Sequence, residues 1–348
     1  MKTRRLRNTA LLVTAALLAL ATGCSSGGSR PAPGALEETN LNVAVVPVEE
    51  SAGFFIALYQ GLFKAQGLNV HFEPAISSDT VIDQQALSTP GTQNAVQITG
   101  GNYVSYIQAQ QNWDAGQRPN ANSSTVAANL DIFAEGSVIE ADSVGIYAMP
   151  GSPIKSLAQL KGRTVAINAP GNVLYLMAAS VLAEHGISPS DVHFVTKYSF
   201  PQMPAELASV GIDAAVLPEP FASEAQEGHG AVLLADLDQG ATTSFPALGY
   251  AVTKQWAQQN PATLAAFYKA LEQGQQIADT NRAAVEKAME ELPAPLGVAK
   301  EAAALMGLDQ YPVSTDPVGS VDAVRLQEVV ASCSSSSDSI RRSRSARC

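Results

Sequence analysis

Apolar and polar residues alternate after residue 39 in a rhythm of strands and helices. Residues 41–46 are almost all apolar, which is typical of a buried strand, whereas residues 68–73 alternate between apolar and polar side chains as a half-buried strand does. Between them, residues 52–60 carry apolar side chains at helical spacing and end at Gly61, a typical helix stop. The first predicted unit has strands at 41–46, 68–73 and 94–99 and helices at 52–60, 80–87 and 102–111.

A second unit repeats this layout further along the chain. Residues 184–194 echo residues 65–72, and residues 207–216 match residues 87–96 at the same internal spacing. Repetition of strand, helix and strand predicts two similar α/β lobes, each built on a mostly parallel sheet. The second unit has predicted strands at 164–168, 192–195 and 214–217 and helices at 172–184 and 204–210.

Two short strand-like stretches flank the second unit. Residues 143–148 and 248–253 each place a glycine close to an aromatic residue, and we expect them to be the two crossings between the lobes. Residues 256–305 are Ala-rich with a helical pattern, so they should pack back on the first lobe. This organisation assigns residues 39–146 and 249–330 to the first lobe and residues 147–248 to the second lobe.

The N-terminus has the pattern of an export signal. Four basic residues within the first seven precede an apolar run over about residues 9–21, and small residues lead to Cys24. This run is shorter than the roughly 20 apolar residues that span a bilayer. The small residues before Cys24 resemble a bacterial lipobox, which predicts a signal peptide at 1–23 and a lipidated Cys24. An ordinary cleaved signal with an incidental cysteine is the alternative.

The anchor and the charge together indicate an exported domain. Residues 24–38 are rich in Ser, Gly and Pro, so we expect a tether that holds the lobes off the outer face of the cell membrane. The net charge of −11 argues against a nucleic-acid partner, because phosphates require Lys and Arg. The chain length of 348 residues and the hydrophobic content of 46% are enough for two lobes with a large core.

The C-terminal tail differs from the rest of the chain. Residues 331–348 are Ser-rich and basic, so we expect disorder there. A disulfide between Cys333 and Cys348 is chemically allowed outside the cytoplasm, but nothing in the sequence requires it. The tail is interpreted as a solvated appendage, with contact to anionic lipid as the alternative.

Four stretches, in order, resemble one family. Residues 51–68 contain an apolar helix followed by Gly61-Leu62-Phe63, and residues 156–166 contain Leu160-Lys161-Gly162, with Gln159 where the family has Asp. Residues 211–221 end in Glu219-Pro220-Phe221, and Asn260-Pro261 precedes the Ala-rich helix. Together they resemble the substrate-binding proteins of nitrate/sulfonate/taurine-type ABC importers, a group that includes the thiamine-precursor binders.

The resemblance implies both an architecture and partners. The fold would be a type II periplasmic-binding-protein-like α/β fold, in which two hinge crossovers join lobes made of mostly parallel sheets flanked by helices. A monomer of this kind holds a small solute in the cleft between its lobes and delivers it to the permease and ATPase subunits of an importer. The sequence is therefore interpreted as an extracytoplasmic lipoprotein that captures a small polar organic solute.

The candidate ligand-binding residues follow from the topology. In open α/β sheets, ligands bind beyond the carboxyl ends of the strands. Glycines in those loops let the backbone approach a ligand closely, and helix N-termini there offer unpaired N–H groups. The predicted contacts are Glu49, Glu50, Ser51, Gly53, Phe54, Thr99, Gly100, Gly101, Asn102, Tyr103, Ser137, Asn168, Gly171, Asn172, Tyr175, Tyr198, Gln202, Met203 and Glu219.

Several of these residues have a structural alternative. The rings of Phe54, Tyr103, Tyr175 and Tyr198 either stack on a ligand or pack within their lobe. Glu49 and Glu50 either contact the ligand or form a solvated loop face, and the interpretation favoured for Glu219 is that it braces its loop. The loops contain no Arg, and Lys197 is the only base beside them. This favours a neutral or partly cationic organic solute over nitrate, and a sulfonate would rely on helix N-termini alone.

Signatures of catalysis are absent from the sequence. The four histidines lack metal-ligand spacing such as H-E-x-x-H, and no G-x-S-x-G, P-loop or G-x-G-x-x-G occurs. We therefore predict neither an enzyme nor a bound metal or cofactor. The alternative is an enzyme on the same fold, related to thiamine-pyrimidine synthases, but those carry a cysteine-rich cluster that this chain lacks between Cys24 and Cys333. A surface receptor or chaperone without a transport role is a third possibility.

Overall fold

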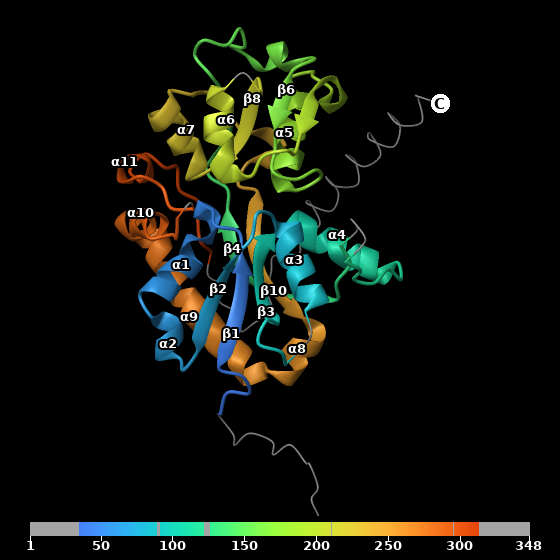
Figure 1. Ribbon diagram of the computed structural model, residues 1–348, viewed down its shortest axis with the longest axis vertical. Coiled ribbons are helices and arrows are strands. Elements are labelled where there is room, and N and C mark those ends of the chain that lie inside the picture. Colours follow the sequence, from blue (N-terminus) through green and yellow to red (C-terminus); the bar gives the residue numbers. More distant parts are fainter. Residues whose placement is uncertain (1–34, 89–90, 122–125, 210, 295, 313–348) are drawn as a thin grey trace, which may run out of the picture.

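The computed structural model describes residues 35–88, 91–121, 126–209, 211–294 and 296–312. These residues form two α/β lobes, one above the other (Figure 1). The predicted signal peptide at 1–23, Cys24, most of the 24–38 tether and the 331–348 tail lie outside the described residues. No helix within the described residues is both long enough and apolar enough to span a bilayer.

The first lobe is built on a five-stranded sheet with the order β2-β1-β3-β10-β4. Strand β1 pairs in parallel with β2 and β3, and β10 is antiparallel to both β3 and β4. All strands except β10 therefore run in one direction. The bounds are Asn40–Val45 for β1, Asn69–Pro74 for β2, Val96–Asn102 for β3, Leu130–Val138 for β4 and Pro246–Thr253 for β10.

The second lobe has a sheet of the same design, with the order β7-β6-β8-β5-β9. Strand β6 pairs in parallel with β7 and β8, and β5 is antiparallel to β8 and β9. The α/β class and the repeated lobe predicted from the sequence are both present. The bounds are Val144–Ala148 for β5, Thr164–Ala166 for β6, His193–Val195 for β7, Ala214–Pro218 for β8 and Val232–Asp236 for β9.

Helices flank both sheets (Figure 1). The first lobe carries α1 (Ala52–Tyr59), α2 (Leu62–Ala65), α3 (Ser78–Leu87), α4 (Tyr103–Asp114), α8 (Lys254–Gln259), α9 (Pro261–Thr280), α10 (Arg282–Glu290) and α11 (Lys300–Ala303). The second lobe carries α5 (Val173–Glu184), α6 (Met203–Ala208) and α7 (Phe221–His229). Short 3-10 turns are η1 (Glu49–Ser51), η2 (Leu157–Leu160), η3 (Pro189–Asp191), η4 (Phe200–Gln202) and η5 (Gly240–Thr242).

The Ala-rich helices return to the first lobe, as their composition predicts. Helix α9 packs along α1 and also contacts α2, and α10 packs on α1. The approach of α9 to α1 is close, because a Cβ added at Gly274 would lie 2.1 Å from the carbonyl oxygen of Gly53. Helix α11 instead packs on α7 of the second lobe, so the C-terminal part of the described chain contacts both lobes.

The crossings lie beside the stretches predicted for them. Strand β5 belongs wholly to the second sheet and β10 wholly to the first, because each pairs with two strands of its own lobe. The chain passes between the lobes over residues 139–143 and 237–245 instead. The predicted lobe boundary after residue 146 thus falls inside β5. A further segment runs beside these hinges, where Gln310 forms an antiparallel bridge with Val138 at the end of β4.

Candidate functional site

A cleft with an empty volume of about 390 Å³ lies between the two lobes. It is lined at the ends of β1 and β8 and at the starts of α3, α4 and α5, as the rule for open α/β sheets requires. The lining residues are Val46, Val48, Glu50, Ser78, Asn102, Ala247 and Leu248 from the first lobe and Asn168, Asn172, Val173, Leu174, Phe200 and Pro218 from the second.

A larger hollow adjoins this cleft and is called the outer hollow here. Its empty volume is about 1,010 Å³, and it shares Val46 and Phe200 with the cleft. The side chain of Ile76 on its rim is exposed, with 66% of its surface open to solvent. The outer hollow is mostly apolar and is lined by Val46, Pro47, Ala75, Ile76, Ser199, Phe200, Pro201, Gln202, Phe221, Glu224 and Leu296.

Asn102 presents a hydrogen-bond donor to the cleft from the first lobe. It is the N-cap of α4, and its Oδ1 accepts a hydrogen bond from the backbone N–H of Ser105 at 2.8 Å. Its own N–H donates to Oγ of Ser78 at 2.8 Å, which holds both residues at the cleft. With Oδ1 occupied by the helix, the polar group of Asn102 that is left for a solute is the Nδ2 donor.

Asn172 and Asn168 form the matching pair on the second lobe. Asn172 caps α5, because its Oδ1 accepts from the N–H of Tyr175 at 3.1 Å. Its Nδ2 donates to Oδ1 of Asn168 at 2.6 Å. The side-chain oxygens of both residues are engaged, so Asn168 also has its Nδ2 donor left for a solute.

Glu50 places a carboxyl group on the cleft wall. Only 7% of the residue is exposed, and its Oε2 has no hydrogen-bond partner among the described residues. Burial, followed by repulsion from Asp309 and Glu219, raises the pKa of Glu50 well above its usual value. A buried carboxyl oxygen without a partner is costly, so a polar group of a solute that pairs with it in the cleft would be favoured.

Behind Glu50, Glu49 and Asp309 are buried at the hinge. Glu49 accepts hydrogen bonds from the hydroxyl of Tyr311 and from the N–H of Asp309, the latter at 3.3 Å. Burial raises the pKa of Glu49 well above its usual value, and repulsion from Asp309 adds to the rise. Burial also raises the pKa of Asp309 to about 7, although the hydroxyls of Ser143 and Ser137 offset part of the rise. These contacts join η1 to the C-terminal segment.

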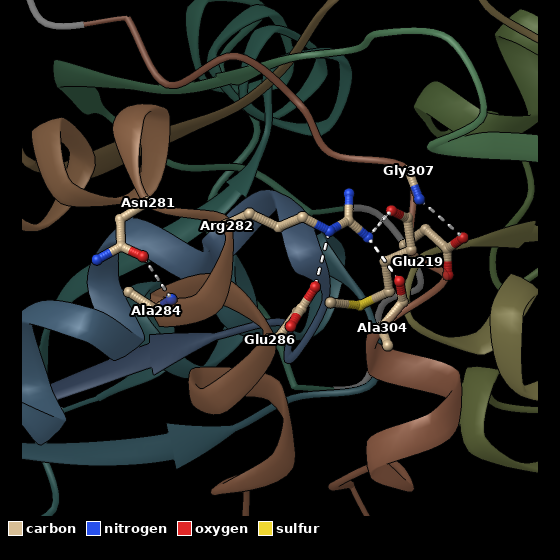
Figure 2. A network of polar contacts seen from close by, with 8 residues as sticks. Glu219, Asn281, Arg282, Ala284, Glu286, Ala304 and Gly307 are labelled. Atoms are coloured by element: carbon tan, nitrogen blue, oxygen red, sulfur yellow. Dashed lines mark hydrogen bonds and ion pairs between the residues drawn. The ribbon is translucent and has the colours of Figure 1, made fainter.

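Glu219 ties the second lobe to the same hinge. Its carboxylate accepts from the N–H and the hydroxyl of Ser223, at 3.0 and 2.9 Å, and from the N–H of Gly307 at 3.3 Å. Figure 2 shows Arg282 beside it, donating to Glu286 and to the carbonyl oxygens of Ala304 and Met306. Burial raises the pKa of Glu219 to about 7. Glu219 therefore braces its loop and does not line the cleft.

These four buried carboxyl groups, Glu49, Glu50, Glu219 and Asp309, are called the acid cluster. They bring together η1, the end of β8 and the segment after α11. The backbone N–H of Glu49 donates to the carbonyl oxygen of Glu219 at 3.0 Å, a direct bond between the lobes. Within the described residues, no group of His, Cys, Asp or Glu is arranged to hold a metal ion.

Two predicted aromatic contacts lie in the interior and away from the cleft. The ring of Phe54 is fully buried and packs against Phe55 and Phe63, with ring centroids 5.3 and 5.6 Å apart. The ring of Tyr103 is buried against Gly249, where an added Cβ would come within 2.7 Å of it. Both rings pack within the first lobe and do not stack on a ligand in the cleft, because each helix turns the side that carries its ring toward the sheet.

Tyr175 and Tyr198 are half-buried on the second lobe and do not line the cleft. The ring of Tyr175 meets Phe194 edge to face at 5.2 Å, and the ammonium of Lys197 lies 5.1 Å from the ring centroid of Tyr198. Met203 is fully buried in the core of this lobe. These side chains pack within the second lobe.

The remaining predicted residues position the site from behind. The hydroxyl of Ser51 donates to Val46, and the hydroxyl of Thr99 donates to Ala251 and accepts from Tyr106. Ser137 is buried at the hinge. Gly53 packs against Gln275, Gly100 against Tyr250 and Gly101 against Ser78, each where a Cβ would crowd its neighbour. Gln202 lines the outer hollow, and its Oε1 accepts from the N–H of Ser199.

Gly171 forms a bridge across the cleft. Its carbonyl oxygen accepts a hydrogen bond from Nε2 of Gln108 at 3.0 Å, which joins α4 of the first lobe to the loop before α5 of the second. Gly171 adopts φ of 72°, a left-handed conformation that suits glycine. Gln108 carries no signal in the sequence, because it lies in the middle of a polar helix face.

Sequence reasoning missed several residues of the site. Ser78 follows the second strand of the sheet, so the tendency of ligands to bind beyond the carboxyl ends of strands applies to it as well. Phe200 and Pro218 line the cleft through contacts formed only by the tertiary fold. Asp309 and Tyr311 lie about 260 residues from Glu49, and no local pattern marks them.

The two-lobed architecture is shared with solved structures of the periplasmic-binding-protein fold. The alkanesulfonate-binding protein SsuA from Xanthomonas axonopodis pv. citri, bound to MOPS, has a TM-score of 0.64 at 17% identity and covers 85% of this chain and 92% of its own. The periplasmic nitrate-binding protein NrtA from Synechocystis PCC 6803 has a TM-score of 0.62 at 18% identity and covers 74% of this chain and 67% of its own. At these identities the similarity shows the periplasmic-binding-protein fold alone.

The family follows from the sequence match. Residues 34–292 match the model of the NMT1-like family, and the chain belongs to that family. The riboflavin-binding protein RibY from Chloroflexus aurantiacus is 26% identical over 257 residues, which are 72% of this chain. The chain spans 65% of the length of that curated relative. The resemblance to nitrate- and sulfonate-type binding proteins is confirmed, whereas nothing in these matches tests the lipid anchor.

Proposed function

We propose that this chain is an extracytoplasmic solute-binding protein that captures a small polar organic solute and delivers it to an ABC import permease. The observation that carries the proposal is the cleft, because both lobes line it and each supplies at least one unengaged polar group. A solute in this position contacts the two lobes at once. Differential contact of this kind shifts a hinged protein toward its closed state.

The contacts between the lobes fit such a closed state. Gln108 bridges to Gly171 at the cleft, and Glu49 bonds to the backbone of Glu219 at the hinge. The two crossing segments and the segment near Gln310 form a compact hinge, about which the lobes rotate. Closure then presents one composite surface, made of both lobes, to the permease.

Riboflavin is the first solute to test, because the curated relative RibY binds it by name. Sulfonates and nitrate follow, because the structural relatives SsuA and NrtA bind an alkanesulfonate and nitrate by name. The described residues that line the cleft include no Cys, His or Lys.

A thermal-shift screen tests the proposal. A solute that binds the native state alone raises the melting temperature in proportion to the logarithm of its concentration. We expect one chemical class among riboflavin, pyrimidines, taurine, alkanesulfonates and nitrate to raise it, and the compound to be recovered unchanged. A flat response to the whole panel, or a bound compound recovered in altered form, would contradict the proposal.

A further inference from the structure

The cleft is built for hydrogen-bond donors and is poorly suited to anions. Its wall holds one buried carboxyl group, Glu50, whose Oε2 has no partner among the described residues. No Lys or Arg is present among the described residues that line it. Strong anions in proteins are usually held by guanidinium or ammonium groups, and a neighbouring carboxylate repels them.

Helix N-termini replace the missing cations only in part. Helices α3, α4 and α5 all begin at or beside the cleft, where their dipoles would favour an anion. Each, however, uses a first-turn N–H group internally, because Ser77, Asn102 and Asn172 cap Thr80, Ser105 and Tyr175. Each cap engages one of the first-turn N–H groups, so fewer of these groups are left for an anion.

The donors that remain belong to neutral amides. The caps engage Oδ1 of Asn102 and Asn172, and Asn172 in turn engages Oδ1 of Asn168. Nδ2 of Asn102 and Nδ2 of Asn168 are therefore the side-chain donors left on these two residues, which line the cleft from opposite lobes. Neutral N–H groups match carbonyl or ring-nitrogen acceptors, and Glu50 between the lobes matches an N–H or O–H donor.

We propose that Glu50 determines the solute class: the cleft takes an uncharged or cationic solute that donates an N–H or O–H group to Glu50 and accepts hydrogen bonds from Asn102 and Asn168. Sulfonates and nitrate are excluded. This inference rests on the proposed function, because it assigns the chemistry of the same cleft. It separates this chain from SsuA and NrtA, whose fold it shares.

Protonation of Glu50 provides a second test, namely the pH dependence of solute binding. Its carboxyl group faces Asp309 from the C-terminal segment, Glu219 from the end of β8, and Glu49 from its own turn. Burial and these acidic neighbours raise its pKa, so part of the population is protonated where a free glutamate is ionised. Only the ionised form accepts strongly from a donor. Binding of a donor solute is therefore expected to strengthen as the pH rises, with release of a proton.

Calorimetry with four probes tests the solute class on the full mature chain. Riboflavin presents an uncharged ring N–H and benzamidine a planar cation, whereas ethanesulfonate and nitrate are anions without a donor. We expect at least one of the first two to bind and neither anion to bind. Binding of ethanesulfonate or nitrate would overturn the inference while leaving the proposed function intact. If none of the four binds, the inference fails, and if the wider thermal-shift panel is also flat, the proposed function fails as well.

Two variants assign the effect to Glu50. Glu50→Gln is nearly isosteric and is expected to weaken binding of the donor probe about 10- to 100-fold, the range for a hydrogen bond to a charged group, and to abolish its dependence on pH. Glu50→Asp keeps the charge on a shorter side chain, so it should lose affinity for the donor probe and still reject ethanesulfonate. It serves where Glu50→Gln does not fold.

The matched control is Glu227→Gln, which removes one exposed acid from α7, away from the cleft. Its affinity for the donor probe and the pH dependence of binding should equal those of the wild type. Unchanged affinity in Glu50→Gln, or an equal loss in Glu227→Gln, would show that Glu50 does not determine the solute class.

Discussion

Three asparagines line the polar wall of the cleft, and the side chains of two of them also cap a helix. Asn102 and Asn172 cap α4 and α5, and Asn168 accepts from Asn172. These residues were predictable, because a capping residue directly after a buried strand lies at the carboxyl edge of the sheet. The buried rings of Phe54 and Tyr103 were not, because a loop sequence does not tell which face of the next helix meets the sheet.

Asp309 makes folding stability depend on pH. Its pKa is about 7 in the folded protein and near the ordinary 3.8 in the unfolded chain. The folded state therefore binds an extra proton between about pH 4 and 7, so stability is highest at acidic pH and falls as the pH rises through this window. Asp309→Asn mimics the neutral form. We expect this variant to be about 1–3 kcal/mol more stable than the wild type at pH 8.

Urea unfolding at pH 5 and pH 8 measures this difference. The variant and the wild type should have nearly the same free energy of unfolding at pH 5 and should diverge at pH 8. Parallel pH profiles of the two proteins would show that Asp309 is ionised in the folded state throughout and that the acid cluster does not titrate as described.

The crossing of α1 and α9 holds the first lobe together at the scale of elements. The two helices approach so closely that Gly274 has no room for a side chain against the backbone of Gly53. Gly274→Ala should destabilise the protein by about 1–3 kcal/mol, the usual cost of overpacking a well-packed contact. Gly228→Ala is the control, because Gly228 lies in α7 with no atom within 4 Å of an added Cβ, and it should be neutral or slightly stabilising.

Chemical denaturation of both variants gives the comparison. If Gly274→Ala lowered the free energy of unfolding no more than Gly228→Ala, α1 and α9 could move apart without cost. That result would contradict the close packing of these helices.

Sequence patterns predicted the strands within the repeated units better than the edge strands and the crossings between the lobes. The strands of each βαβ unit are apolar runs bounded by turns, and six predicted strands overlap those observed. Strand β4 was missed because Asp131 and Glu135 interrupt its apolar pattern, and β9 because it lies half-exposed at the sheet edge. The crossings were misplaced by a few residues, because a strand next to a hinge looks the same in sequence whichever sheet it joins.

At the scale of the whole molecule, two sheets with equivalent strand orders lie one above the other (Figure 1). The cleft is lined by residues of both lobes. The hinge consists of residues 139–143, residues 237–245 and the segment near Gln310. These segments are far apart in the sequence, so no local pattern shows that they lie together. The acid cluster and the cleft exist only in this assembled form. The sequence could therefore predict that a cleft is present, but not how Glu50 is placed in it.

The position of the molecule in the cell is tested at Cys24, which lies outside the described residues. If Cys24 carries the lipid, this lipid is what holds the wild-type protein at the membrane surface. Cys24→Ser should therefore release the protein from the membrane into the soluble exported fraction. Fractionation followed by immunoblotting measures the distribution, with Ser25→Ala as the control. Equal membrane association of Cys24→Ser and the wild type would indicate an ordinary signal peptide without lipidation.

Small-angle scattering with and without a bound solute tests most directly whether the two lobes close on the solute. A compound that passes the thermal-shift screen is added at saturation, and the radius of gyration is compared with that of the free protein. Closure of the lobes about the hinge should make the bound protein measurably more compact. An identical radius of gyration for the free and saturated protein would contradict capture of the solute between moving lobes.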